Sequence, residues 1–197
     1  MRRFMKRVVI RIALWWWFNW SKVYRSWFES SEVSKLKPDD YSTIDLVLNA
    51  AMSVKWIKDG PRQLFDAIGS PERFQYLLNS SKDAESGNDC DEFAVWCHVI
   101  MNRVMELGHL SFKVAPIVLT VTWTEGCKIQ GHNVCVYQRE DGEWYHIGNW
   151  GLRGSFNSFS SSVEDVLQGR PLLKWAVWTY PGDLRDYDVV LRDMKGT

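Results

Sequence analysis

The chain has 197 residues, of which 46% are hydrophobic and 24% are charged, and its formal net charge at pH 7 is zero. This composition is typical of a globular protein with a buried core, and it excludes a disordered or fibrous chain. The four cysteines form neither a dense framework nor pairs with structural-zinc spacing, which argues against a disulfide scaffold and a structural metal. We therefore expect reduced thiols and a cytoplasmic setting.

Basic residues are concentrated at the N-terminus. Residues 1–28 contain seven basic and no acidic residues, whereas the remainder of the chain contains 17 basic and 24 acidic residues. Apolar residues, many of them tryptophan, recur there at helical spacing, and Arg3, Arg7 and Arg11 lie four residues apart. Residues 1–30 are therefore predicted to form a basic, tryptophan-rich amphipathic helix.

The role of this helix stays open at the level of the sequence. The uncharged run of residues 12–21 is too short to span a membrane, and Arg11 interrupts the apolar run that a signal peptide needs. The helix is suited to an anionic membrane surface, and equally to packing on its own domain or on a partner subunit. Nucleic-acid binding is less favoured. The protein is thus expected to be cytoplasmic, peripheral to a membrane or part of a larger assembly.

The next segments are a linker and three short helices. Residues 31–42 are rich in Ser, Lys, Pro and Asp and are predicted to be a linker. Residues 43–58 show an amphipathic helical pattern, and residues 61–68 are predicted to form a short helix. Ser70 is a suitable N-cap for a further helix, and Pro71 favours its first turn. This helix is predicted to run to about residue 78.

The strongest helical pattern begins at Cys90 and continues to Leu107. Asp89 or Asn88 can cap its start, and Gly108 ends it. Beyond it the spacing of apolar residues changes to that of strands, with a tight turn at residues 140–143 that makes 132–148 a hairpin. A short helix is predicted at 162–168. The predicted strands are 112–123, 132–138, 143–148 and 172–180.

Helices followed by strands predict an α+β domain over residues 43–197. Cys90 is its most reactive candidate, because a thiolate at a helix start faces unpaired N–H groups and the positive end of the helix dipole. Asp89 and Asp91 oppose that effect, so a positively charged partner is needed. The alternative interpretation of a single cysteine is a small buried apolar residue.

His132 begins a predicted strand and is the best candidate for the base of Cys90. His146, on the second strand of the hairpin, is its competitor and has the simpler interpretation of a surface or cross-strand histidine. Asn149 follows that strand and is placed to orient an imidazole, although Asn-x-Gly is also a common turn. The candidate catalytic residues are therefore Cys90, His132 and Asn149, without a metal ligand or a cofactor-binding residue among them.

The segments GNDCDEFAVW and GHNVCVYQREDGEWYHIGNWG resemble the transglutaminase-like superfamily, particularly its bacterial cysteine proteinases. The resemblance covers residues 55–152. It implies a papain/transglutaminase-like core in which the helix that carries Cys90 packs on an antiparallel sheet. One departure concerns the third catalytic residue: Gly148 stands where the family has Asp, and Asn149 lies one residue beyond it.

Two functions of different classes follow. The first is cysteine-dependent acyl transfer on amide bonds of a peptide or protein substrate, as a protease or amidase or as a transglutaminase, without a cofactor. The second is a catalytically degenerate copy of the fold, in a phage or bacterial protein, that serves structure, membrane docking or virion assembly. Gly148 and the basic helix favour the second function, whereas the Cys90 motif and the hairpin favour the first.

Overall fold

The structure is a computed structural model of the whole chain. It describes residues 16, 35–54, 70–80, 89–125, 128–180 and 190–192. The predicted helices at 1–30 and 61–68 lie outside these ranges, apart from Trp16. The helices are η1 (Pro38–Asp40), α2 (Ile44–Ser53), α3 (Pro71–Ser80), α4 (Cys90–Glu106) and α5 (Phe159–Leu167).

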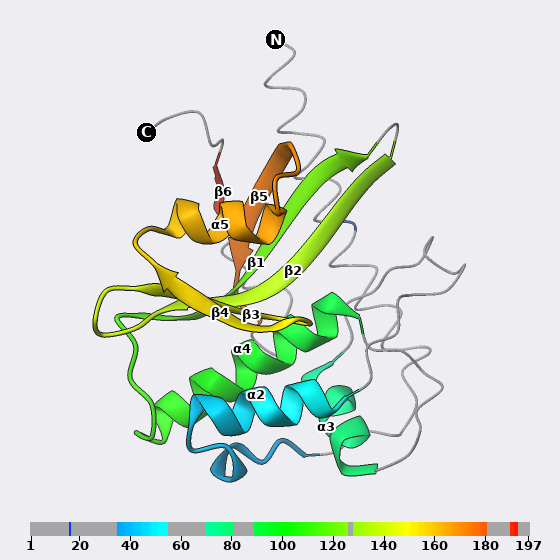
Figure 1. Cartoon of the computed structure of the whole chain (residues 1–197). Helices are drawn as coiled ribbons and strands as arrows, with labels where there is room; N and C mark the ends of the chain where they lie inside the picture. The colour runs from blue at the N-terminus through cyan, green and yellow to red at the C-terminus, as the bar shows by residue number, and fades with distance from the viewer. Residues whose placement is uncertain are drawn as a thin grey trace.

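The strands form one antiparallel sheet in the order β4-β3-β2-β1-β5-β6. Helices α2, α3 and α4 gather on one side of this sheet, and α5 lies on the other side (Figure 1). The predicted α+β class is therefore confirmed, with a helix packed against an antiparallel sheet. The strands are β1 (Val114–Glu125), β2 (Lys128–Gln138), β3 (Trp144–Gly148), β4 (Gly151–Phe156), β5 (Leu172–Trp178) and β6 (Val190–Arg192).

Helix α4 begins at Cys90 because the residue before it is a strong N-cap. The Asp89 carboxylate accepts from the N–H groups of Asp91 and Glu92, and the Glu92 carboxylate accepts from the N–H of Asp89, 3.1 Å away. This capping box satisfies donors that an uncapped helix would leave open. Asp89, rather than Asn88, is thus the cap.

Two apolar clusters lie on the two faces of the sheet, and we call these faces the α4 face and the α5 face. Odd-numbered residues of β2 point to the α4 face, and even-numbered residues point to the α5 face, as strand alternation requires. On the α4 face, α4 contributes Phe93, Trp96, Cys97, Ile100, Met101 and Val104, which pack with Cys135, Tyr137 and Ile147. On the α5 face, Val134 and Val136 pack with Val163, Val166 and Leu167 of α5.

The predicted linker is in part packed on the domain. Leu36 and Tyr41 lie against the apolar cluster of the α4 face. The Tyr41 ring meets Trp96 edge-on at 5.3 Å, and the Tyr41 hydroxyl accepts from Nε2 of Gln75 at 3.1 Å. Apolar contact of this kind outweighs the linker-like composition, so packing against the domain already begins at Leu36.

One strand escapes the sequence pattern. β4 has the sequence GLRGSF, which lacks the alternation of a strand, and it pairs with β3 at the edge of the sheet. A Cβ on Gly154 would lie 1.8 Å from the ring of Tyr145, so only glycine allows the two strands to approach here. Within the described ranges, no helix is long and apolar enough to cross a membrane.

Candidate functional site

Cys90 is the first residue of α4, and its side chain is half-buried. Its Sγ donates to Oδ1 of Asp91 at 3.6 Å, and the ligand atoms of Asp89, Cys90 and Asp91 all lie within 4.8 Å of one another. The thiol thus stands between two carboxylates, which disfavour a thiolate. The N–H groups of Asp91 and Glu92 bond the Asp89 carboxylate, so in this state neither is available to an oxyanion.

His132 lies on β2, opposite Val121 of β1, and its side chain is on the α5 face. Its ring stacks on the indole of Trp150 with 4.5 Å between the ring centroids and 26° between the planes. The β2 side chain that reaches α4 is the next one, Asn133, whose Nδ2 donates to Oδ1 of Asp91 at 3.4 Å. The pairing of Cys90 with His132 stays a prediction.

Electrostatics nevertheless connects His132 to the start of α4. Burial lowers the pKa of His132 from its ordinary value of 6.5 to about 4, the carboxylate of Asp89 acts against that shift, and His146 and Arg170 add to it. The imidazole is therefore neutral at pH 7 and able to accept a proton. A neutral imidazole does not supply the positively charged partner that Cys90 is expected to need.

Asn149 lies in the turn between β3 and β4, beside Trp150. Within the described residues, Oδ1 of Asn149 and Nε2 of His132 are both buried, and neither has a hydrogen-bond partner. Cys135 pairs with Ile147, so the same register continued toward the turn puts Asn149 level with residue 133. A donor and an acceptor that both lack a partner thus lie at the same end of the sheet.

Neighbouring side chains occupy the space beside Gly148, the position at which the resemblance implies Asp. A Cβ on Gly148 would lie 3.0 Å from Cε2 of Trp150 and 3.1 Å from Cγ1 of Val134. The indole of Trp150 therefore occupies the space that a side chain at 148 would need. It is the same indole that stacks on His132, so the imidazole is held by an aromatic ring.

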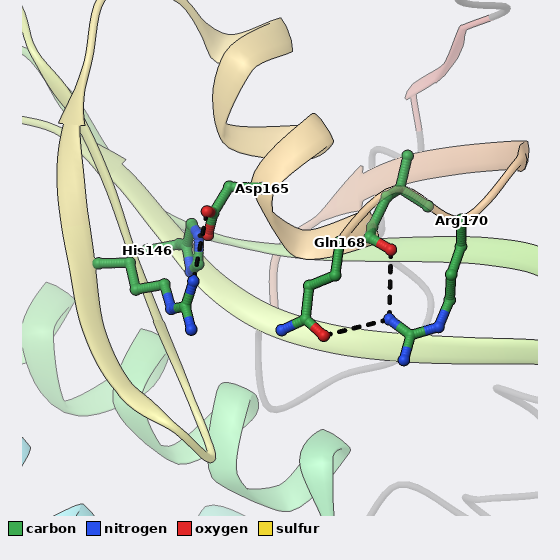
Figure 2. Close-up of polar contacts among 6 residues, drawn as sticks. His146, Asp165, Gln168 and Arg170 are labelled. Carbon is green, nitrogen blue, oxygen red and sulfur yellow. Dashed lines mark hydrogen bonds and ion pairs between the residues drawn. The ribbon is translucent and has the colours of Figure 1, made fainter.

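His146 is fully buried and belongs to a different contact. Its Nε2 bonds to Oδ2 of Asp165 at 3.0 Å, and its ring lies parallel to Phe156 at 5.5 Å. Figure 2 shows His146 on β3 directed at Asp165 on α5. Nη1 of Arg153 approaches the other oxygen of Asp165 at 3.4 Å. His146, the alternative candidate to His132, thus links β3 to α5.

Arg170 follows α5 and is fixed beside the same face. Its Nη1 donates to the carbonyl of Leu167 at 3.2 Å and to Oε1 of Gln168 at 3.3 Å (Figure 2). Its guanidinium lies 5.0 Å from the ring centroid of Trp123. The positive charge near His132 is therefore held in place by local contacts.

A buried polar chain that the sequence did not indicate runs across the sheet. It connects Asp91 on α4 with Asn133 on β2, Thr120 on β1 and Trp178 on β5. The register places Thr120 opposite both Asn133 and Ala176. Its only sequence signal is the presence of polar residues at core positions of strands, which a single sequence does not separate from surface alternation.

Two other described cysteines are buried thiols. Burial raises the pKa of Cys97 and of Cys135, far enough that both stay protonated at neutral pH. Both are free thiols. Cys90 is thus the candidate nucleophile among the three, while Cys127 lies outside the described residues. Among the described residues, the ligand atoms of Asp89, Cys90 and Asp91 lie close enough together to hold a metal ion.

No protein-family model matches this chain, and the searches of curated proteins and of solved structures likewise produced no match.

Proposed function

We propose that this protein is a cysteine-dependent acyltransferase of the papain/transglutaminase-like type, which acts on amide bonds with Cys90 as the nucleophile. His132 is the proposed base and Asn149 the residue that orients it. The proposal includes membership of the transglutaminase-like superfamily, whose motif is matched by Cys90 and by the hairpin. The substrate class is a peptide or protein amide.

One observation carries this proposal. A buried, neutral imidazole with an unsatisfied Nε2 lies in electrostatic range of Asp89, the residue that precedes Cys90. Unsatisfied buried polar atoms are costly and cluster where function needs them. His132 and Asn149 supply one such atom each, and a hydrogen bond from Nε2–H to Oδ1 would satisfy both.

The proposed reaction uses His132 as a general base rather than as a preformed cation. Because His132 lies on the α5 face and α4 on the other face, this step requires the imidazole to reach Sγ of Cys90 at the end of the sheet. His132 then accepts the thiol proton as Sγ bonds to the carbonyl carbon of the substrate. The C–N bond then breaks, and the amine leaves with the proton that the imidazole had taken. Water next attacks the thioester with His132 as base, the S–C bond breaks, and a carboxylic acid is released. An amine in place of water gives transamidation.

A second function is favoured by a specific observation. The Cys90 thiol bonds to Asp91, and the His132 ring packs on Trp150 on the α5 face. A fold that has lost catalysis and serves structure, membrane docking or assembly would retain such packing. The two functions differ in what Cys90 does when an acyl donor is offered.

The test is acylation of the full-length protein by p-nitrophenyl acetate. We expect release of p-nitrophenolate together with an acetylated Cys90 peptide, seen by mass spectrometry, and loss of both in Cys90→Ala. His132→Gln should slow acylation by roughly 10²–10⁴-fold, the usual contribution of a general base. His109→Gln is the matched control, because His109 is exposed in the turn after α4.

Equal acylation in the parent and in Cys90→Ala would contradict the proposal, since the reacting group would then lie elsewhere. An acetylated Cys90 whose rate is unchanged by His132→Gln would remove His132 from the mechanism. If Cys90 is not acylated at all in the folded parent, the binding or assembly function is the one that remains.

A further inference from the structure

The buried polar chain has a direction that its chemistry fixes. The indole N–H of Trp178 is only a donor, and it donates to Oγ1 of Thr120 at 2.9 Å. The hydroxyl hydrogen of Thr120 is then used to donate to Oδ1 of Asn133. The amide of Asn133 can therefore present only its NH₂ group to its other neighbour.

That other neighbour is Asp91, and its carboxylate also receives the thiol of Cys90. Nδ2 of Asn133 lies 3.4 Å from Oδ1 of Asp91, and Sγ of Cys90 lies 3.6 Å from the same oxygen. Asn133 and Asp91 are 4% and 2% exposed, so water screens this contact little. One carboxylate oxygen is thus shared between the proposed nucleophile and a donor whose orientation is set by Trp178.

We propose that Asn133 is a positioning residue that acts through Asp91: it holds the carboxylate at the Cys90 thiol and shares its charge, and so sets how readily the thiol loses its proton. The proposal rests on the proposed function, in which Cys90 is the nucleophile. Asn133 acts through its hydrogen bond to Asp91. Thr120 and Trp178 take part in the same positioning, because they determine which end of the Asn133 amide faces Asp91.

Other titratable groups lie near this end of the fold, and the test has to keep them constant. Asp89 caps α4 beside Cys90, and Glu92 lies in the first turn of α4. His132 on β2 is influenced by Asp89, by His146 on β3 and by Arg170 after α5. None of them is altered in the variants below.

The experiment measures the rate of Cys90 alkylation by iodoacetamide against pH in the full chain, with mass spectrometry of the Cys90 peptide. Asp91→Asn removes a negative charge beside the thiol, so the midpoint should fall by about one pH unit. Asn133→Leu leaves Asp91 charged but without its amide donor, so the midpoint should rise by about half a unit. Combined with Asp91→Asn, Asn133→Leu should have no further effect.

The double substitution separates positioning from mere structure. A shift caused by Asn133→Leu that is equally large with Asp91 and with Asn at 91 would overturn the proposal, as would no shift in either. Asn102→Leu, on α4 and bonded to the Pro116 carbonyl, is the matched control and should leave the midpoint unchanged. If Asn133→Leu does not fold, Trp178→Phe replaces it, and it should shift the midpoint in the same direction but less.

These outcomes are independent of those of the acylation test. If Cys90 is not acylated but the Asp91–Asn133 coupling is observed, the proposed function fails and the positioning role stands. If Cys90 is acylated with His132 as base but the coupling is absent, the function stands and the positioning role is overturned.

Discussion

The ring of His132 lies nearly flat on the indole of Trp150, and the same indole fills the space above Gly148. A hydrogen bond to a carboxylate is the usual way to orient a catalytic imidazole. Here the orientation comes from aromatic packing, and the burial that accompanies it makes His132 a weaker base than a free histidine. Trp150 therefore controls both the position and the basicity of the proposed base.

Shortening Trp150 should therefore raise the pKa of His132. Trp150→Ala exposes the imidazole, so its pKa should move from about 4 toward 6.5, because burial is the largest cause of the shift. NMR titration of the histidine ring protons measures this directly. Trp144→Ala is the matched control, since Trp144 stacks edge-on with Phe159 at the far end of β3. An unchanged His132 titration in folded Trp150→Ala would show that this indole does not cause the shift.

Filling position 148 should disturb the same packing. In Gly148→Ala the new Cβ would meet Trp150 at 3.0 Å and Val134 at 3.1 Å, and neither an indole nor a strand side chain moves easily in a packed core. We expect a loss of about 1–3 kcal/mol in the free energy of unfolding, measured by urea denaturation. Gly131→Ala is the control, because its nearest contacts, at 3.5 Å, are ordinary. A Gly148→Ala protein as stable as the parent would mean that Trp150 adapts.

Much of the fold follows from local signals in the sequence. The start of α4 at Cys90 was predictable because Asp89 is a good cap, and the hairpin because residues 140–143 form a turn between alternating strands. The helix after Ser70 is predictable because Ser70 is a good cap, and the Ser70 hydroxyl accepts from the N–H of Arg73 at 3.2 Å. Such signals act over a few residues and need no tertiary context.

The features that were missed depend on contacts between distant residues. β4 forms because Gly154 admits the ring of Tyr145, which no local pattern shows. The sequence marks His132 as the strand residue beside Cys90, but alternation turns Asn133 to the α4 face and His132 to the α5 face. A one-residue difference in register decides which side chain meets the helix, and the sequence alone does not fix it.

Removing the acceptor of His146 should destabilise the contact between β3 and α5. Asp165→Ala leaves Nε2 of a fully buried imidazole without its 3.0 Å partner, which should cost about 1–3 kcal/mol in urea unfolding. Asp165→Asn retains an acceptor oxygen and should cost less. Glu164→Gln, at the exposed neighbouring position on α5, should change little. If Asp165→Ala is as stable as the parent, the hydrogen bond to His146 contributes nothing to stability.

Acidification should destabilise the fold through His98. Its Nδ1–H donates to the Pro116 carbonyl at 2.7 Å, and its Nε2 accepts from the N–H of Tyr180 at 2.9 Å, so the buried ring is neutral. Burial lowers the pKa of His98 from 6.5 to about 4. The unfolded chain therefore binds a proton that the folded chain does not, and the stability held above pH 6.5 is lost as the pH falls toward 4.

The stability lost through His98 over this interval is about 3 kcal/mol, because the pKa falls from 6.5 to about 4 on folding. Urea unfolding at pH 7, 6, 5 and 4 measures the loss. His98→Gln should be less stable than the parent at pH 7, because Gln fits the two backbone contacts less well, but its stability should fall less steeply with acid. His109→Gln should keep the slope of the parent. Equal slopes in His98→Gln and the parent would place the acid sensitivity in other groups.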